Sequence, residues 1–191
     1  MTRIIAGVHG GRRLVAPAGG STRPTADRVR EAFFSALGTM LDLSGARFVD
    51  LYAGSGAVGL EALSRGASHV LLVEAEAKAA RVIRDNIASL RAGLSARLIT
   101  GRVSQVLATE PDGGPYDVVF ADPPYLVGDD EVTAVQRSLI DHGWLTADAV
   151  VVFERSTRTA VRGAPLSWVD GITADRSRRY GETTLWYGRR S

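Results

Sequence analysis

The stretch DLYAGSGAVG, residues 50–59, decides the fold of this 191-residue chain. It carries a G-x-G-x-x-G pattern between an apolar run at 47–51 and a stretch with helical spacing at 57–65. Glycines at this spacing allow a tight turn from strand to helix and let the backbone approach a ligand closely. The stretch therefore predicts the first strand, the ligand-binding loop and the first crossover helix of an α/β domain.

The central part of the chain repeats this alternation of strand and helix. Four more runs rich in Val, Leu and Ile follow, at 69–74, 96–100, 116–121 and 149–154, and the helical stretches between them lie at 76–92, 102–109 and 130–142. Strands that are apolar throughout and separated by helices are typical of a parallel sheet covered on both faces. We therefore expect a doubly wound α/β domain.

Both ends of the chain add strands to this domain. Strand candidates at 166–173 and 183–188 have only an Arg-rich loop between them, which predicts an antiparallel terminal hairpin. At the other end, 3–8 and 12–15 read as two strands joined by a glycine turn, a small basic hairpin. We expect an N-terminal hairpin extension at residues 1–20 and a main domain at residues 21–191, which opens with a helix capped by Thr25.

The composition excludes several classes of protein. The chain has no cysteine, which excludes disulfide scaffolds, thiolate metal sites and cysteine nucleophiles, and its three histidines are dispersed, so we expect no metal site. No apolar run approaches the roughly 18 to 20 residues that a bilayer requires, and the first residues lack the apolar segment of a signal peptide. We expect a cytoplasmic protein with no membrane partner.

The net charge of +2 conceals a segregation of charge along the chain. Residues 1–30 hold six arginines against one acid and residues 155–191 hold eight against three, so each end carries +5 while the part between them carries −8. Clustered arginines are typical of a face that meets nucleic acid, although a solvated basic surface explains them equally well. The candidates for phosphate contact are Arg12, Arg13, Arg178 and Arg179.

Two acids near the glycine loop bear on which ligand it binds. A dinucleotide would bring a pyrophosphate to this loop, where Asp50 would repel it, whereas S-adenosylmethionine brings an α-ammonium group that needs an acceptor. Glu74, at the end of the next predicted strand, stands where an acid can hold ribose hydroxyls. Asp50 thus favours the methyl donor, and a buried acid that caps the loop is its structural alternative.

The tetrapeptide Asp122-Pro123-Pro124-Tyr125 directly follows the predicted strand at 116–121. Two prolines hold the backbone extended, so that the Asp122 carboxylate and a main-chain carbonyl can converge on one point. Two acceptors at one point suit an exocyclic amino group, and Tyr125 offers an aromatic face to a base flipped out of its helix. Hydrogen bonds from the amine to these acceptors would turn its lone pair toward a sulfonium methyl group.

Three further stretches carry a resemblance to a known family. They are RIIAG at 3–7, RPTADRVREAF at 23–33 and YGET at 180–183. Together with DPPY at 122–125, they resemble the RsmD family of 16S ribosomal RNA guanine-N2 methyltransferases over nearly the whole chain. The resemblance implies a seven-stranded Rossmann-like methyltransferase fold with an N-terminal hairpin and S-adenosylmethionine as donor. It also implies that the acceptor is a guanine of 16S rRNA within a small ribosomal subunit or an assembly intermediate.

The resemblance also implies roles for individual residues. It assigns the methionine end of the cofactor to Asp50, Gly54, Ser55 and Gly56, the ribose to Glu74, and the adenine to Arg102 and Val103. Many methyltransferases have an acid or an amide where Arg102 stands, which leaves a main-chain amide as the alternative adenine contact. Arg23, Thr25 and Arg28 fall in the motif before the sheet, which would close over the cofactor or contact RNA.

Other functions stay open on the residues alone. A DNA adenine-N6 methyltransferase would share residues 122–125, but such enzymes usually add a target-recognition region, and fewer than 40 residues follow Glu154. A catalytically inert RNA-binding module would have no need of Asp50, Glu74 and Asp122 together. A nicotinamide oxidoreductase is disfavoured by the charge of Asp50 beside the loop.

Overall fold

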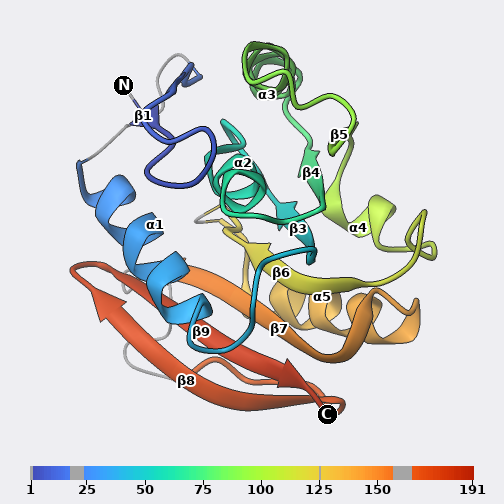
Figure 1. Ribbon diagram of the computed structural model, residues 1–191. Helices are drawn as coiled ribbons and strands as arrows, with labels where there is room; N and C mark the ends of the chain where they lie inside the picture. Colours follow the sequence, from blue (N-terminus) through green and yellow to red (C-terminus); the bar gives the residue numbers. More distant parts are fainter. Residues whose placement is uncertain (1, 18–23, 125, 157–164) are drawn as a thin grey trace.

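The computed structural model describes residues 2–17, 24–124, 126–156 and 165–191. Seven strands form one sheet in the order β5-β4-β3-β6-β7-β9-β8 (Figure 1). They are β3 (Arg47–Leu51), β4 (His69–Glu74), β5 (Ala96–Thr100), β6 (Tyr116–Ala121), β7 (Leu145–Ser156), β8 (Ile172–Tyr180) and β9 (Thr183–Arg190). The first five are parallel to one another, and β9 runs antiparallel to both β7 and β8. The expected doubly wound sheet with an antiparallel end is confirmed.

Helices cover both faces of this sheet (Figure 1). They are α1 (Pro24–Leu37), α2 (Ala57–Ser64), α3 (Ala77–Ser89), α4 (Val103–Val106) and α5 (Asp129–Asp141). Apolar side chains of α1, α2 and α3 pack in one buried cluster, while those of α4 and α5 pack in a second cluster on the opposite face. None of the helices in the described ranges combines the length and the hydropathy needed to cross a membrane.

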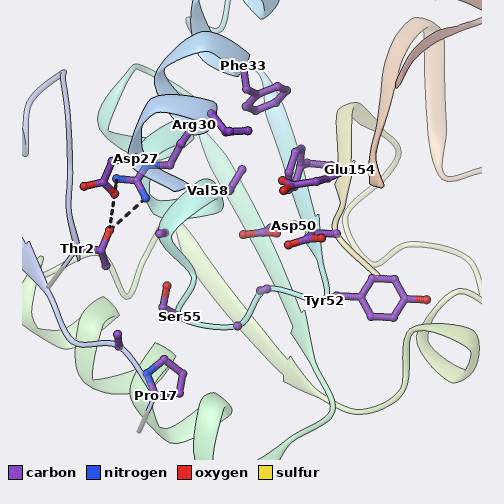
Figure 2. A pocket seen from close by; sticks show the side chains of 17 residues that line it. Thr2, Pro17, Asp27, Arg30, Phe33, Asp50, Tyr52, Ser55, Val58 and Glu154 are labelled. Carbon is purple, nitrogen blue, oxygen red and sulfur yellow. Dashed lines mark hydrogen bonds and ion pairs between the residues drawn. The ribbon is translucent and has the colours of Figure 1, made fainter. Parts of the chain in front are cut away.

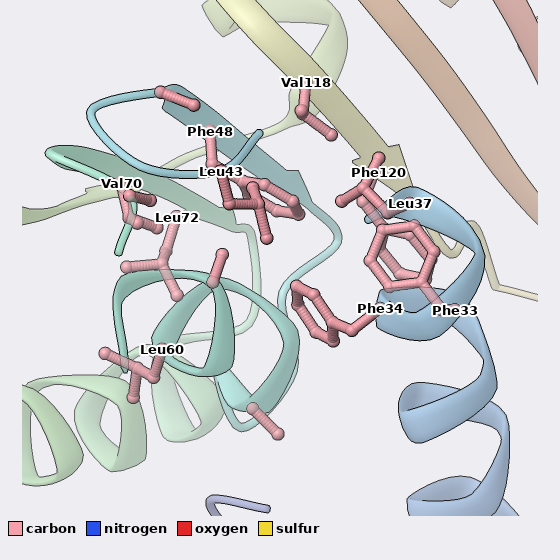
Figure 3. Packing of buried hydrophobic residues seen from close by; sticks show 14 of the residues in the cluster. Phe33, Phe34, Leu37, Leu43, Phe48, Leu60, Val70, Leu72, Val118 and Phe120 are labelled. Carbon is pink, nitrogen blue, oxygen red and sulfur yellow. The ribbon is translucent and has the colours of Figure 1, made fainter. Parts of the chain in front are cut away.

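Side chains of the central strands alternate between the two clusters. Phe48 of β3 packs in the first cluster with Phe33 and Phe34 of α1, whereas Val49 and Leu51 pack in the second (Figure 3). All three of these β3 side chains are fully buried, because helices lie on both sides of the strand. This is why the sequence shows continuous apolar runs rather than an alternation of apolar and polar residues.

Strand β3 lies at the point where the order of the sheet reverses. The chain runs outward from β3 to β4 and β5, and then crosses back to β6 on the other side of β3. Such a reversal opens a crevice at the carboxyl ends of the strands. The glycine loop follows β3, Glu74 ends β4, and Asp122 follows β6. The fold therefore brings these three sequence-predicted features to one edge of the sheet.

The C-terminal part of the sequence prediction is wrong in one respect. The Arg-rich segment expected to be a loop is strand β8 itself, and most of the apolar segment at 166–173 is not a strand. β8 is an edge strand whose residues are nearly all exposed, so no apolar alternation marks it. Residues 167–169 are held instead by Gln136, which donates to the carbonyl of Ser167 at 3.0 Å and accepts from the N–H of Val169 at 3.1 Å.

Two helix predictions also need correction. Helix α1 begins at Pro24, so Thr25 lies inside the first turn and is not the N-cap. Proline is favoured at the first helical position because its fixed φ suits the helix and its missing N–H has no partner there. The helix predicted at 102–109 is also shorter, with α4 covering only Val103–Val106.

The N-terminal hairpin is present but is shorter than predicted. Strands β1 (Thr2–Arg3) and β2 (Arg13–Leu14) pair antiparallel. The N–H groups of Ile5 and Ala6 donate to the two carboxylate oxygens of Glu61 in α2, at 2.7 and 3.0 Å, instead of extending the ladder. The hairpin thus docks on the main domain, and the domain division at residue 20 stays a prediction because it falls outside the described residues.

Candidate active site

The glycine loop turns sharply between β3 and α2. Gly54 and Gly56 have φ values of 58° and 77°, the left-handed region that favours glycine, and Gly56 occupies the N-cap of α2. A Cβ at Gly56 would lie 2.9 Å from a methyl group of Leu72 in β4, so the helix could not pack as closely with a larger residue. Tyr52 also has a positive φ of 61°, which is rare for a non-glycine residue and marks local strain beside the loop.

Asp50 is almost fully buried beneath this loop. One of its oxygens, Oδ2, accepts the N–H of Gly59 in α2 at 2.9 Å. Burial raises the pKa of Asp50 well above its ordinary value, the Gly59 N–H opposes that shift, and the charges of Asp122 and Glu74 add to it. Asp50 therefore ties α2 to β3, which agrees with the structural role considered as the alternative to ligand binding. It also lines a hollow that reaches the loop.

Glu74 connects the end of β4 to the glycine loop. Its Oε2 accepts the N–H of Gly54 at 2.8 Å, and its Oε1 accepts the N–H of Glu76 at 2.8 Å. Each carboxylate oxygen keeps a further lone pair, so both can still accept hydroxyl groups. Glu74 lines a hollow of about 750 Å³, the β4 hollow, together with Arg102 and Val103.

Two other hollows adjoin the β4 hollow. The α1 hollow, of about 390 Å³, reaches from the glycine loop to α1 (Figure 2). It is lined by, among others, Asp50, Gly54, Ser55, Arg30, Phe33, Asp122 and Glu154. The β7 hollow, of about 160 Å³, is lined by Asp122, Pro123, Pro124, Glu154, Arg155, Ser156 and Thr183. Asp122 lines all three hollows, and the prolines after it line the β7 hollow.

The electrostatics of this junction are unusual for carboxyl groups. The Asp122 carboxyl is open to solvent at the mouth of the hollows, yet desolvation by the surrounding protein raises its pKa to about 6. Glu154 is half-buried, and burial together with the charge of Asp122 raises its pKa to about 8. Desolvation and the repulsion between the two charges thus make this pair of carboxyl groups ionise less readily than free carboxyl groups do.

Sequence reasoning missed several side chains that line these hollows. Glu154 ends the fifth parallel strand, and Tyr52 and Glu131 line the β4 hollow, where the Tyr52 hydroxyl lies 3.4 Å from Glu131 Oε1. Burial and the charge of Glu131 raise the pKa of Tyr52. Position at the carboxyl end of a strand was a usable signal for Glu154 and Tyr52, because the ends of parallel strands meet at one edge.

Some residues named from the resemblance lie where the structure gives no account of them. Arg23 and Tyr125 fall outside the described residues, and Thr25 is placed only as part of the α1 backbone. Their functional assignments stay predictions. In the described ranges, no three His, Cys, Asp or Glu side chains gather closely enough to hold a metal ion.

The predicted RNA-contacting arginines occupy two separate places. The hairpin that carries Arg12 and Arg13 lies on the other side of α1 from β8, which carries Arg178 and Arg179 (Figure 1). Arg12 donates to the carbonyl of Ser89 at 2.6 Å, and Arg179 donates to the carbonyl of Gly181 at 2.9 Å. Arg28 is exposed on α1, between these two groups.

The strand order is that of the fold of S-adenosylmethionine-dependent methyltransferases. The fold alone is shared with the magnesium protoporphyrin IX methyltransferase of Synechocystis PCC 6803, solved with bound S-adenosylmethionine. That structure has a TM-score of 0.66 and 16% identity, with coverage of 87% of this chain and 80% of the other. A family model described as "Conserved hypothetical protein 95" matches residues 2–189, and the chain belongs to this family.

Named relatives agree with the RsmD resemblance. The chain is 38% identical to the "Ribosomal RNA small subunit methyltransferase D" of Escherichia coli strain K12 over 166 residues, which cover 87% of this chain and 80% of the relative. The solved structure of yhhF from Escherichia coli superimposes with a TM-score of 0.85 at 35% identity, covering 100% of this chain and 98% of that one. The resemblance seen in the sequence is therefore confirmed.

Proposed function

We propose that this protein transfers the methyl group of S-adenosylmethionine to the exocyclic N2 amine of a guanine in 16S rRNA. The relatives named for small-subunit rRNA methylation cover most of the chain, which supports this substrate class. We further propose that the reaction takes place in the cytoplasm, on a small ribosomal subunit or an assembly intermediate. The observation that carries the proposal is the position of Asp122, which faces the α1, β4 and β7 hollows at once.

The α1 and β4 hollows fit the cofactor. Glu74 has acceptor capacity left for the ribose hydroxyls, and Arg102 with Val103 borders the same space and would flank the adenine. Gly54 lines both hollows, and Asp50 and Ser55 extend the lining toward the methionine end, where Gly56 lets the backbone turn. Asp50 Oδ1 accepts no hydrogen bond from the described residues, and it is the atom we assign to the α-ammonium group.

Asp122 provides the chemistry at the acceptor amine. When bound, S-adenosylmethionine supplies an electrophilic sulfonium methyl group. The Asp122 carboxylate accepts an N–H of the amine, and a carbonyl of the Pro123-Pro124 segment accepts the second, which points the nitrogen lone pair at the methyl carbon. As the bond from N2 to the methyl carbon forms, the bond from that carbon to the sulfonium sulfur would break and leave the neutral thioether. The surplus N2 proton would pass toward Asp122, whose pKa desolvation raises to about 6.

The arginines would hold the RNA beside this site. Arg178 and Arg179 lie at the end of β8 that is on the carboxyl edge of the sheet. Thr183 of β9 pairs with Tyr180 of β8 on one side and with Ser156, the last residue of β7, on the other. We assign these arginines, and those of the N-terminal hairpin, to phosphate groups. Arg23, Thr25 and Arg28 would close over the cofactor or contact RNA, and Tyr125 would stack on the flipped guanine.

Mapping of modified bases tests the proposal. 16S rRNA would be taken from cells with the gene, without it, and with an Asp122→Ala copy, and its N2-methylguanines located by mass spectrometry. We expect one guanine to lose its methyl group on deletion and to stay unmethylated with the variant. Identical maps in all three strains would contradict the proposal, and loss of an N6-methyladenine would favour an adenine acceptor. Transfer by purified protein to naked 16S rRNA and to small subunits then identifies the substrate particle.

A further inference from the structure

Glu154 is a carboxyl group at this site to which the proposed chemistry gives no role. It ends the parallel part of β7 and lines both the α1 hollow and the β7 hollow, beside Asp122 in each. It is absent from the lining of the β4 hollow, where Glu74 and Arg102 lie. Glu154 therefore lies away from the adenosine end of the cofactor, and the β7 hollow, which it lines together with Asp122, is the space left for the acceptor base.

The register of the sheet sets Glu154 next to Asp122. Ala121 of β6 pairs with Phe153 of β7, so Asp122 and Glu154 come next on two parallel neighbours and point to the same face. Neighbouring strands lie about 4.8 Å apart, which brings the two side chains within reach of one planar base. Leu185 of β9 pairs with Glu154 of β7 on one side and with Arg178 of β8 on the other. Glu154 therefore lies in the same row of the sheet as an arginine proposed to bind RNA.

Neither carboxyl group of this pair receives a hydrogen bond from a residue that the structure describes. Among the described residues, no N–H or O–H group donates to the side chain of Asp122 or Glu154, and the neighbouring Arg155 points away, donating to Val127 and Asp129 at 3.0 Å each. Burial and the Asp122 charge raise the pKa of Glu154 to about 8. A ligand that brings N–H donors to both groups would relieve this crowding of acceptors.

Guanine offers two adjacent donors on one edge. Its Watson–Crick edge presents N1–H beside the N2 amine, whereas adenine and cytosine present an amine beside a bare ring nitrogen, which is an acceptor. We propose, on the basis of the function proposed above, that Glu154 accepts the N1–H of the target guanine while Asp122 accepts its N2 amine. Glu154 is then the residue that selects guanine, because adenine and cytosine would set a lone pair against its carboxylate.

The proposal predicts a specific response to bases that keep the N2 amine but lack N1–H. Such bases are 2,6-diaminopurine and 2-aminopurine, the second of which also has no group at position 6. Small-subunit RNA with guanine or either analogue at the mapped position would be prepared by ligation, and kcat/KM measured for each. We expect the wild-type protein to prefer guanine by about 100-fold, since a site built for an N–H rejects bases without it.

Variants at position 154 then separate specificity from rate. In Glu154→Gln the amide can accept N1–H or donate to a bare N1, so the preference for guanine should fall to less than about fivefold. Glu154→Asp keeps an acceptor-only group and should keep a preference of at least about tenfold at a lower rate. Glu110→Gln, at an exposed acid that lines none of the three hollows, is the matched control and should behave as wild type.

The outcomes are distinguishable from failure of the proposed function. Titration with S-adenosylhomocysteine shows that each variant is folded, because Glu154 does not line the β4 hollow. If wild type methylates guanine and Glu154→Gln keeps the full wild-type preference, the assignment of N1–H to Glu154 is overturned while the proposed function stands. Equal wild-type rates on guanine and both analogues would overturn it as well. No transfer to any of these RNAs by the wild-type protein would overturn both.

Discussion

Asp122 is the side chain on which the proposed chemistry depends most directly. Because it meets the amine rather than the cofactor, Asp122→Ala should lower kcat by about 100- to 1,000-fold, the usual effect of losing one well-placed polar contact in a preorganised site. Affinity for S-adenosylhomocysteine should change by less than about threefold. Single-turnover methyl transfer and calorimetric titration measure the two effects, with Asp130→Ala, an exposed acid in the first turn of α5, as control. Near-normal turnover of Asp122→Ala would end this assignment.

Glu74 should show the opposite division of effects. Its replacement by alanine removes the acceptor for the ribose and also frees the N–H of Gly54, so cofactor affinity should fall. Hydrogen bonds to a charged group contribute roughly 1.5 to 3 kcal/mol, which corresponds to about 10- to 150-fold in Kd. At saturating cofactor, kcat should change little. Titration of Glu74→Ala with S-adenosylhomocysteine is the measurement, and an unchanged Kd would show that Glu74 is not the ribose ligand.

At the scale of elements, the N-terminal hairpin depends on one buried carboxylate of α2. Glu61 accepts the N–H groups of Ile5 and Ala6 and the guanidinium of Arg65 at 2.7 Å, and Arg30 lies 3.7 Å away. Glu61→Gln would remove one of the two acidic partners of buried Arg30, whose other partner is Asp27 at 3.2 Å, and should lower the free energy of unfolding by about 1.5 to 3 kcal/mol. Urea unfolding measures this loss, with the exposed Glu31→Gln as control. Hydrogen exchange at Ile5 and Ala6 should quicken; unchanged protection there would mean that the hairpin is held by other contacts.

The two arginine groups should differ in their effect on RNA binding. Arg178 and Arg179 lie on the exposed strand β8, and replacing both with alanine should flatten the logarithmic salt dependence of RNA affinity by about 1.4 to 1.8. Replacing Arg12 and Arg13 should flatten it less, because β8 is joined through β9 to the end of β7 at the site, whereas the hairpin lies on the other side of α1 (Figure 1). Salt titrations of both double variants test this, with Arg81→Ala/Arg137→Ala, two exposed positions on α3 and α5, as control. Equal slopes for all variants would show that β8 does not contact phosphate.

The elements that the sequence predicted well are those whose burial is complete. Four of the five parallel strands were predicted with the bounds that the structure shows, because helices on both faces demand continuous apolar runs. β7 is longer than the run predicted at 149–154 and covers Leu145–Ser156. β8 was not predicted because an exposed edge strand has no buried face to leave a pattern. Asp50, Glu74 and Asp122 could be found because each lies close to the end of a predicted strand. Glu154 also ends a predicted strand, but its place beside Asp122 follows from the pairing of Ala121 with Phe153, which local sequence does not reveal.

For the whole molecule, the crowded carboxyl groups predict how stability depends on pH. Asp50, Asp122 and Glu154 all have raised pKa values, so the folded protein binds protons more readily than the unfolded chain. Their contribution to stability is present below about pH 4 and is lost as the pH rises through about 6 and about 8. The free energy of unfolding of the cofactor-free protein should therefore fall between pH 5 and pH 8.5 on account of these groups.

Glu154→Gln provides the comparison for this pH dependence. The neutral amide removes the group whose pKa is about 8, so the variant should lose less stability than wild type over the upper part of that range. Urea unfolding at several pH values measures both proteins. Asp112 and Asp175 have lowered pKa values owing to their arginine partners, so they affect stability only at lower pH and do not obscure the comparison. Parallel curves for the two proteins would contradict the burial of charge at this junction.

β8 is also the outermost strand of the sheet, and its arginines have a second consequence there. A free strand edge is a template for adding a strand from another copy, which is a common start of aggregation. Arg176, Arg178 and Arg179 are carried on nine residues of this edge, so two copies that approached edge to edge would bring like charges together. We therefore expect the exposed arginines of β8, two of which are proposed to bind RNA, also to oppose edge-to-edge association of copies that are free of substrate.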